Sequence, residues 1–316
     1  MLVYILYVIG SLVVLYFGAN ALVKGAASLA ERLGVSALVV GLTVVAFGTS
    51  TPELIVSVQA AMEGFGGISI GNVVGSNIAN IGLILGLSAL IYPLKAHMQL
   101  IRFDTPIMIA TALLFLVLFL DQRIGRIEGI VFLAGIIAYT VFNVIKSRKE
   151  KQKLVINEFE ESIPKVSRHW ALDVLFIVLG LAALIVGSEF LVDNAVGLAR
   201  LLGLSEAVIG LTIVAVGTST PELATSVVAA IKKQPDIAIG NIVGSNIFNI
   251  LGILGVASLV KPISSPEINI TDTLMMIFMS LLLLPFIKTG FTLRRWEGGL
   301  MLAIYAGYVV YLLNWA

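Results

Sequence analysis

The six-residue stretch GTSTPE occurs twice in this 316-residue chain, at positions 48–53 and again at 217–222. In a water-soluble protein it would mark the start of a helix, because Ser50 or Thr51 can cap the helix, Pro52 suits its first turn and Glu53 completes an S-x-x-E capping box. Both copies, however, lie in the middle of apolar segments long enough to cross a bilayer. The stretch therefore predicts a helix break and a carboxylate at membrane depth.

The composition is that of an integral membrane protein. Hydrophobic residues make up 59% of the chain and charged residues 12%, and the mean hydropathy is +1.04. A net charge of +1, without a basic tract carrying aromatic residues, gives no indication of nucleic-acid binding. The absence of cysteine excludes disulfides, thiolate metal sites and cysteine nucleophiles.

Ten apolar segments are separated by short polar breaks, and each reaches the ~20 residues that a membrane-spanning helix needs. The first lacks a basic leader region and is too long for a signal-peptide core, so we expect it to be retained. The predicted spans are 2–31, 36–62, 67–92, 103–120, 126–145, 170–200, 205–231, 236–260, 270–288 and 295–315.

One sizeable polar loop separates the fifth span from the sixth. The segment 146–169 carries seven lysines and arginines. By the positive-inside rule this loop is cytoplasmic and both termini face outward. We expect a multi-pass protein of the cell membrane, surrounded by lipid and working as a monomer.

The second half of the sequence repeats the first. Gly41 aligns with Gly210 and Pro93 with Pro262 without a gap, and well over half of the positions from 41 to 88 are identical to their partners. Each half contains five spans, an odd number, so the second half must insert upside down relative to the first. This predicts an all-α membrane fold of two inverted five-helix repeats, 1–146 and 170–316, joined by a linker at 147–169.

Glu53 and Glu222 lie near the centres of the second and seventh predicted spans. An ionisable side chain at this depth costs about 2.5–3.5 kcal/mol and usually faces protein or a polar cavity. A structural glutamate paired with a buried cation is the alternative. Lys24 is the one lysine or arginine well inside another predicted span, and it has no cationic counterpart in the second repeat. Two symmetric carboxylates without symmetric cationic partners favour a bound ion.

The helix breaks supply further oxygen atoms. Pro52 and Pro221 lack a backbone donor, so carbonyl groups around 46–49 and 215–218 are freed at the end of each first half-helix. These carbonyls can bind cations only where they line a cavity. Hydroxyl groups add to this set, although a membrane serine or threonine can also bond back to its own helix; they belong to Thr49, Ser50, Thr218 and Ser219.

A second repeated motif occupies the third and eighth spans, GNVVGSNIANIG at 71–82 and GNIVGSNIFNIL at 240–251. On a helix its serine and final asparagine are four positions apart and share one face. Helix packing explains the glycines in part. It explains less well the amides at mid-span, so we expect Asn80 and Asn249 to coordinate an ion.

The candidate ligands are all oxygen atoms, without sulfur or imidazole. Such a set suits hard cations such as Ca²⁺ and Na⁺ and argues against zinc or copper. Two glutamates balance the charge of one Ca²⁺, and the same oxygens can instead hold two or three Na⁺. Mutual exclusion at a shared site, combined with alternating access, would make an exchanger.

The motifs GTSTPE and GNxxGSNIxN, present in both halves, closely resemble the alpha-repeats of the cation/calcium exchanger superfamily, in particular those of prokaryotic sodium/calcium exchangers. The resemblance covers nearly the whole chain apart from the linker. It implies a core of spans two, three, seven and eight, over which spans one and six slide. It also implies central ligands Glu53 and Glu222, carbonyls of Thr49 and Thr218 at a calcium site, a middle lined by Asn80 and Asn249, and flanking sites of Ala46, Ala215, Ser50, Ser219, Ser76 and Ser245.

Asparagine at position 249, where some relatives carry aspartate, removes a third carboxylate and weakens the case for potassium co-transport. Proton/calcium exchange at the same glutamates is the runner-up, although that branch has a different signature around its glutamates. The sequence lacks the motifs of an intramembrane protease. Paired carboxylates in inverted repeats also suit a binding site better than the pore of a passive channel. We expect no enzymatic activity and no cofactor. Lys24 and Asp193 occupy equivalent positions in spans one and six, where they can pair, bias sliding or extend toward the membrane surface.

Overall fold

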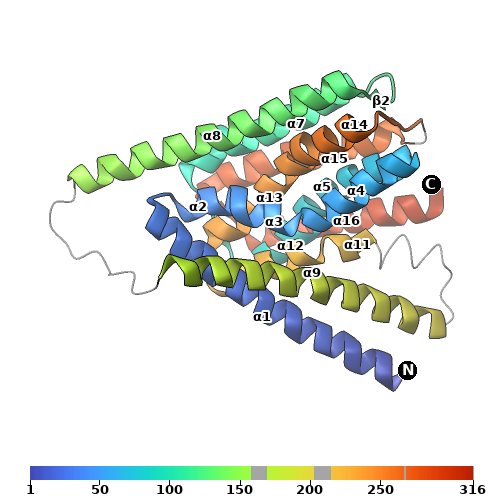
Figure 1. The fold of residues 1–316 in the computed structure, drawn as a ribbon, viewed down its shortest axis with the longest axis horizontal. Helices are drawn as coiled ribbons and strands as arrows, with labels where there is room; N and C mark the ends of the chain where they lie inside the picture. The colour runs from blue at the N-terminus through green and yellow to red at the C-terminus, as the bar shows by residue number, and fades with distance from the viewer. Residues whose placement is uncertain (158–168, 203–214, 267, 316) are drawn as a thin grey trace.

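The computed structural model describes residues 1–157, 169–202, 215–266 and 268–315, and it consists almost entirely of helices (Figure 1). Within these residues, eight helices are long and apolar enough to cross a membrane, and a bent helix pair forms a ninth such segment. The second half of the remaining span is helical as well. The predicted all-α fold of ten membrane helices is therefore confirmed.

The first repeat comprises α1 (Leu2–Leu33), the broken second span of α2 (Ala37–Val40), η1 (Gly41–Val45), α3 (Ala46–Thr49) and α4 (Thr51–Glu63), the third span of α5 (Gly66–Ala79), η2 (Asn80–Leu85) and α6 (Gly86–Ile91), the fourth span of η3 (Leu100–Asp104) and α7 (Thr105–Leu118), and α8 (Arg126–Asn157). The second repeat comprises α9 (Trp170–Leu201), α11 (Ala215–Thr218) and α12 (Thr220–Ile231), the eighth span of α13 (Pro235–Phe248), η5 (Asn249–Ile253) and α14 (Leu254–Val260), then α15 (Ile270–Lys288), η6 (Thr289–Phe291) and α16 (Arg295–Trp315).

The fifth helix is longer than the sequence predicts. It does not end at 145, because α8 continues to Asn157, well into the segment predicted as a linker. The sequence KSRKEKQK is rich in good helix formers, which extend the helix beyond the apolar part. The first part of the seventh predicted span and the rest of the linker lie outside the described residues.

The two repeats run in opposite directions through the molecule. The helix α1 starts at the end where both termini lie, called here the terminal end, and finishes at the end where α8 stops and α9 begins, called the loop end (Figure 1). Its counterpart α9 runs the opposite way. The inverted arrangement predicted from the odd number of spans is thus present.

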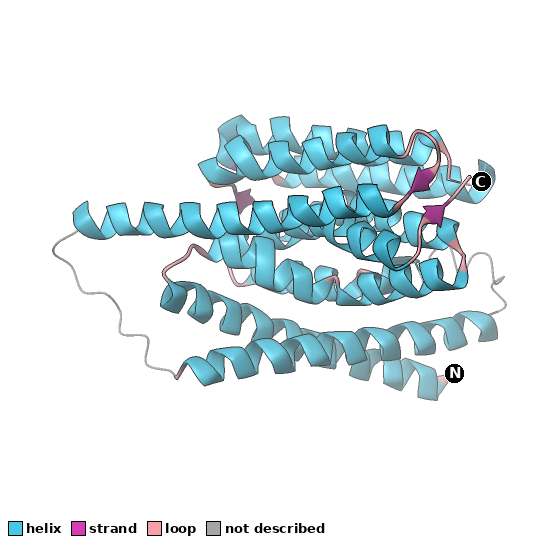
Figure 2. Ribbon diagram, turned by 45° about the horizontal axis from the view of Figure 1, so that its top comes forward, coloured by secondary structure: helices cyan, strands magenta, loops and turns pink. Residues whose placement is uncertain are grey.

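The long helices α1 and α9 lie side by side and cross along one side of the molecule, apart from most other helices (Figures 1 and 2). Gly180 allows their close approach, since a Cβ added there would lie 2.8 Å from the Gly18 carbonyl oxygen. At the loop end the Arg32 guanidinium contacts the buried Asp173 carboxylate at 2.9 Å. These contacts make the pair one unit that rests on the other helices.

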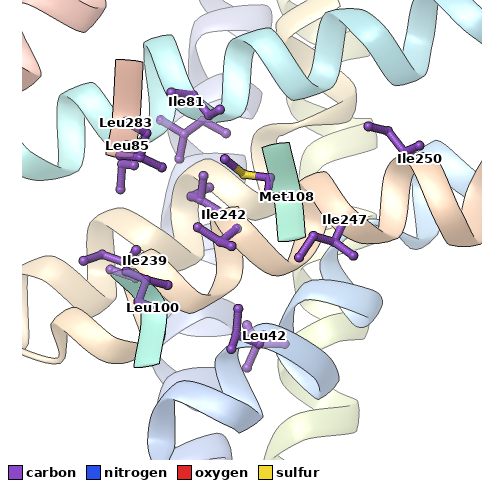
Figure 3. Packing of buried hydrophobic residues seen from close by; sticks show 14 of the residues in the cluster. Leu42, Ile81, Leu85, Leu100, Met108, Ile239, Ile242, Ile247, Ile250 and Leu283 are labelled. Carbon is purple, nitrogen blue, oxygen red and sulfur yellow. The ribbon is translucent and has the colours of Figure 1, made fainter. Parts of the chain in front are cut away.

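The most buried helices are α5 and α13, which meet in the centre of the molecule. Ile242 and Ile247 of α13 lie there with Ile81 of η2 and Met108 of α7 (Figure 3). The third and eighth spans therefore form a close-packed core that holds the repeated motifs in fixed positions.

Short strands join the two repeats at both ends of the molecule. The strand β1 (Leu94–Lys95) pairs antiparallel with β4 (Thr292–Leu293) at the loop end, and β2 (Arg123–Ile124) pairs with β3 (Ile263–Ser264) at the terminal end (Figure 2). Each pair takes one strand from each repeat. The repeats are therefore tied together by backbone hydrogen bonds at both ends of the molecule, and each strand also buries one side chain in the apolar core.

The outer helices preserve the repeat in a tyrosine–aspartate contact. The Tyr139 hydroxyl donates to Asp104 at 3.1 Å, and the Tyr308 hydroxyl donates to Asp272 at 2.7 Å. Tyr308 is the counterpart of Tyr139 in the repeat alignment, whereas the counterpart of Asp104 is Thr273, one position after Asp272. The aspartate of the second repeat thus lies one position before the place that the repeat alignment predicts. The stretch 41–88 aligns with its counterpart without such an offset.

Candidate ion-binding site

The first GTSTPE copy forms the predicted helix break. The helices α3 and α4 belong to one span that bends by 48° at Ser50, whose backbone has φ −83° and ψ 12°. Ser219 in the second copy has nearly the same conformation, with φ −87° and ψ 11°. In both copies the proline occupies the first turn of the following helix, where its missing N–H costs least.

The break does not form the capping box that this stretch would form in a water-soluble protein. Ser50 occupies the position before α4, but its side chain makes no capping hydrogen bond with that helix. Its hydroxyl lies instead 2.8 Å from Oε1 of Glu222 and 3.0 Å from the hydroxyl of Ser245, both in the other repeat. The Ser50 side chain thus bonds to the other repeat instead of capping its own helix.

This contact belongs to a cluster of oxygen atoms on one side of the site. Ser245 also donates to the carbonyl oxygen of Ala46 at 3.4 Å. Glu222, Ser50 and Ser245 are almost completely buried. The structure therefore brings together four of the predicted ligand residues, contributed by the second, seventh and eighth spans.

The symmetry-related cluster lies on the other side. The Ser219 hydroxyl is 3.1 Å from Oε1 of Glu53 and 3.4 Å from the hydroxyl of Ser76. These residues are also buried. Ala215 is the predicted counterpart of Ala46, and its side chain lies outside the described residues. Each glutamate is thus held by a serine from the opposite repeat.

Four buried oxygen atoms at the site have no hydrogen-bond partner within the described chain. They are Oε2 of Glu53, Oε2 of Glu222, Oδ1 of Asn80 and Oδ1 of Asn249. Leaving such acceptors unpaired inside a protein is costly, more so for carboxylates. All four belong to residues that the sequence singles out as cation ligands, and they form two symmetric pairs. The arrangement leaves negative charge and free lone pairs at the centre of the molecule.

A layer of amides joins α5 to α13 beside these oxygens. Asn77 and Asn246 each donate to the backbone carbonyl of the other at 3.3 Å, so the pseudo-twofold axis passes between them. Asn80 donates to Oδ1 of Asn246, and Asn249 donates to Oδ1 of Asn77, both at 3.0 Å. These bonds use the side-chain NH₂ groups of Asn80 and Asn249 as donors. The side-chain oxygen of each residue therefore remains free to accept another partner.

Asn77 and Asn246 were not predicted as site residues. Both lie inside the repeated GSNIxN motif, so their recurrence at equivalent positions of the two halves was available as a signal. The same applies to Asn72 and Asn241. Asn72 donates to the carbonyl of Glu53 at 3.1 Å, and Asn241 donates to Oγ of Ser226 at 3.0 Å.

Helix irregularities occur at matching positions in the two repeats. The π-helical turns η2 and η5 begin at Asn80 and Asn249 respectively. Such turns are frequent at functional sites because they shift a side chain off the regular helical spiral. A further π-helical turn, η1, precedes the break in the second span.

The two predicted threonine positions differ in exposure. Thr49 is 1% exposed and donates to Oδ1 of Asn241 at 3.1 Å, and also to the Ala46 carbonyl at 3.3 Å. Thr218 is only half-buried and lines a cavity of about 360 Å³.

This cavity leads to the helix breaks. Pro52 of the first break and Gly217 of the second both line it, so it reaches the two GTSTPE copies from the side of α9. Glu189 and Asp193 of α9 give its wall a negative charge. The cavity is therefore lined by acidic side chains of α9 and by residues of both breaks.

The cavity reflects a difference between two symmetric helix contacts. Toward the loop end, α1 packs along α12. The equivalent helices α9 and α4 make little contact through their described residues. Among the described residues, α1 thus covers α12 toward the loop end, whereas a cavity adjoins the helix breaks beside α9.

The electrostatics of the site favour a cation. Glu53 and Glu222 lie close enough for their negative charges to repel each other. Among the described residues, neither carboxylate forms a salt bridge with lysine, arginine or histidine. The alternative of a structural glutamate neutralised by a buried cationic side chain therefore finds no support in this part of the chain.

Comparison with known proteins agrees with this geometry. A family model described as "Sodium/calcium exchanger protein" matches residues 3–145 and again residues 172–314. The chain belongs to the sodium/calcium exchanger family. Among its relatives, the putative antiporter CaxA of Alkalimonas amylolytica is 39% identical over 313 residues, covering 98% of each chain. The sodium/calcium exchanger MaX1 of Methanosarcina acetivorans is 38% identical, covering 95% of this chain and 96% of its own.

A solved member of the family has the same fold. The sodium–calcium exchanger NCX_Mj, in crystals soaked with 10 mM Na⁺ and no Ca²⁺, superposes with a TM-score of 0.84 and 33% identity, over 100% of both chains. The structural similarity between the two proteins thus extends over both repeats.

Proposed function

We propose that this protein is a secondary antiporter that exchanges Na⁺ for Ca²⁺ across the membrane by alternating access. The observation that carries the proposal is the set of four unpartnered, buried oxygen atoms on Glu53, Glu222, Asn80 and Asn249. They combine two negative charges with two neutral acceptors, a combination that suits Ca²⁺. Membership of the sodium/calcium exchanger family supports the same ion pair. Proton-coupled exchange at the same glutamates is not favoured by the comparisons.

Ca²⁺ would bind between Glu53 and Glu222 in this proposal. The carbonyls of Thr49 and Thr218 would complete its ligands, and Asn80 and Asn249 would line the middle. Na⁺ ions would occupy the flanking clusters, one formed by Ala46, Ser50 and Ser245, the other by Ala215, Ser219 and Ser76. Hydrogen bonds of 2.8 and 3.1 Å tie each glutamate to a flanking serine. A Na⁺ that recruits this serine therefore competes for the carboxylate that Ca²⁺ needs.

The cavity beside α9 would be the route to the site in the conformation described here. It touches both breaks through Pro52 and Thr218, whereas α1 closes the opposite side against α12. Sliding of the α1–α9 pair across the remaining helices would close this route and open the symmetric one. Such motion fits a pair of helices held mainly to each other (Figure 2).

The remaining proposals concern topology and assembly. Both termini would face outward, the linker 147–169 would be cytoplasmic, and the halves 1–146 and 170–316 would be the two repeat domains of a monomer. The double match of the family model, to 3–145 and 172–314, supports this division. The activity would be transport alone, without catalysis or a cofactor.

Transport driven by a sodium gradient tests the function directly. Purified protein in liposomes loaded with Na⁺ is diluted into Na⁺-free medium containing radioactive Ca²⁺, with pH equal and buffered on both sides. We expect uptake that stops when the Na⁺ gradient is collapsed. Uptake driven by a pH gradient but indifferent to Na⁺ would instead establish proton exchange.

A labelling experiment tests the orientation and uses the absence of native cysteine. A single cysteine is introduced as Asp121→Cys at the terminal end or as Ser162→Cys in the linker. We expect a membrane-impermeant maleimide to label the first variant in intact cells and the second only after permeabilisation. The reverse pattern would overturn the proposed topology.

A further inference from the structure

A second cavity lies at the loop end, away from the candidate ion site. Its volume is about 470 Å³, and it is bounded by α1, α9 and the region where α12 passes into α13. Its polar lining consists of Asn20, Lys24, Lys232 and Gln234, and its apolar lining includes Phe17 and Phe176. It is therefore amphipathic, unlike the acidic cavity that reaches the helix breaks.

The charge of this cavity is unbalanced. Lys24 comes from α1 and Lys232 from the end of α12, and both side chains are exposed. Burial of part of the Lys232 side chain lowers its pKa, and the nearby charge of Lys24 lowers this pKa further. No carboxylate lines the described cavity wall, and neither lysine forms a salt bridge within the described residues. Two mutually repelling cations facing one hollow indicate a site for an anion.

The hydrogen-bonding groups narrow the class of ligand. Lys232 donates to Oδ1 of Asn20, and an ammonium group retains two further donors. Gln234 contributes a buried Oε1 that has no hydrogen-bond partner in the described part of the chain. The cavity thus offers cationic donors for an acidic oxygen and one free acceptor for a hydroxyl group.

The position of the cavity identifies the source of such a ligand. It lies at the end of the molecule that carries most of the lysines and arginines, where anionic lipid headgroups gather beside basic pockets between helices. Phe17 is 62% exposed on the outer surface of α1 and can contact an acyl chain. We propose that this cavity binds the phosphate of an anionic lipid of the phosphatidylglycerol type between Lys24 and Lys232, with Gln234 accepting from the headgroup glycerol.

Such a lipid would connect two parts of the molecule that differ in their packing. Lys24 belongs to the peripheral α1–α9 pair, whereas Lys232 follows a core helix that carries Glu222. A bridging phosphate would hold α1 against α12 and so keep the loop end closed. This inference concerns binding and does not depend on which ions are transported.

Thermal unfolding of the purified full-length protein in detergent tests the proposal. Short-chain phosphatidylglycerol is titrated, with short-chain phosphatidylcholine and inorganic phosphate as separate arms. We expect phosphatidylglycerol alone to raise the melting temperature. Lys24→Gln or Lys232→Gln should raise the half-maximal lipid concentration about tenfold, since each removes a charge-assisted hydrogen bond.

Lys233→Gln is the matched control, because it removes the exposed charge of a neighbouring side chain that lies outside the cavity wall. It should leave the titration unchanged, and Lys24→Arg with Lys232→Arg should restore binding. An equal response to phosphatidylcholine, or an equal loss in all three glutamine variants, would overturn the site. An equal response to inorganic phosphate would overturn the assignment to a lipid.

Discussion

At the scale of single residues, the decisive feature is an exchange of partners between repeats. Each glutamate is bonded through one oxygen to a serine of the other half, and its second oxygen is left free among the described residues. A side chain held in this way is oriented without being neutralised. The repeated break thus produces two buried carboxyl groups whose positions depend on the opposite repeat as well as on their own helix.

Neutralising either carboxylate should abolish calcium transport. Glu53→Gln or Glu222→Gln removes one of two charged ligands, at a cost of about 3 kcal/mol or roughly a hundredfold in affinity. Radioactive Ca²⁺ uptake into liposomes measures the effect. Glu63→Gln is the control, because Glu63 is exposed on the same helix α4 and accepts from the Gln59 amide at 2.9 Å, away from the site. Full uptake by both site variants would refute the site.

Removing the Ser50 hydroxyl should weaken sodium binding more than it lowers the stability of the fold. Ser50→Ala deletes a 2.8 Å hydrogen bond to a carboxylate, and such bonds contribute about 1.5–3 kcal/mol. We expect the Na⁺ concentration for half-maximal exchange to rise about tenfold. Thr51→Ala should have little effect, since the Thr51 hydroxyl bonds back to the carbonyl of Phe47 at 3.1 Å. Equal changes in the two variants would contradict a role for Ser50 in binding.

At the scale of helices, one glycine of the eighth span determines how closely this span approaches the second. A Cβ added at Gly244 would lie 2.4 Å from the carbonyl oxygen of Leu42. At the equivalent Gly75, an added Cβ meets nothing within 4 Å in the described part of the chain. Gly244 is therefore required for the contact between α13 and η1 in this conformation, whereas position 211, the repeat equivalent of Leu42, lies outside the described residues.

Alanine substitution at Gly244 should destabilise the protein. Gly244→Ala pushes α13 away from η1, and we expect a loss of about 1–3 kcal/mol in stability, as for other overpacked cores. Gly307→Ala is the control, because Gly307 is exposed on α16 and a Cβ added there meets nothing within 4 Å among the described residues. It should leave the melting temperature nearly unchanged. Thermal unfolding of both purified variants measures the difference. Equal destabilisation by the two variants would show that the close contact at Gly244 does not determine the stability of this packing.

The helices themselves could be predicted closely from sequence. Spans predicted at 270–288 and 295–315 coincide with α15 and α16, because a run of about 20 apolar residues between polar breaks has few alternatives in a membrane. The extension of α8 to Asn157 was missed, since apolar length does not report where a polar helix stops.

The contacts between helices could be predicted only in part. Symmetry and chemistry predicted Glu53, Asn80 and their counterparts as ligands, and these are residues whose buried oxygens lack partners in the described chain. The mutual bonds of Asn77 and Asn246 were not predicted, because they depend on which faces of α5 and α13 meet. The pairing of β1 with β4 could not be predicted either. Each strand is only two residues long and carries almost no sequence signal, and the two strands belong to different repeats.

At the scale of the whole molecule, the two symmetric ends carry opposite charge beside the α1–α9 pair. Glu189 and Asp193 line the cavity that reaches the breaks, whereas their equivalents Asn20 and Lys24 line the cavity at the loop end. Acidic walls attract cations and raise their rate of entry. The symmetry of the fold is thus broken electrostatically.

This asymmetry predicts side-specific kinetics. Glu189→Gln with Asp193→Asn should raise the KM for Ca²⁺ on the terminal side about tenfold at low ionic strength, and the effect should shrink as salt screens the charges. The KM on the loop side and the maximal rate should not change. Oppositely oriented membrane vesicles give access to each side.

The matched control is Glu63→Gln with Asp121→Asn, which removes two exposed carboxylates at the same end but outside the cavity wall. It should leave all the constants unchanged. A similar rise in KM with the control pair would attribute the effect to general surface charge.

The strands that join the repeats also bear on how such a chain arises by gene duplication. Because β1 pairs with β4 and β2 with β3, neither half contains a complete strand pair of its own among the described residues. A single five-helix ancestor that inserted in both orientations would have found its strand partner only in a second copy of itself, and the amides on the axis would have met in the same way. Fusion of two such genes then converts an obligatory association into an intramolecular one, and frees each half to acquire its own charge.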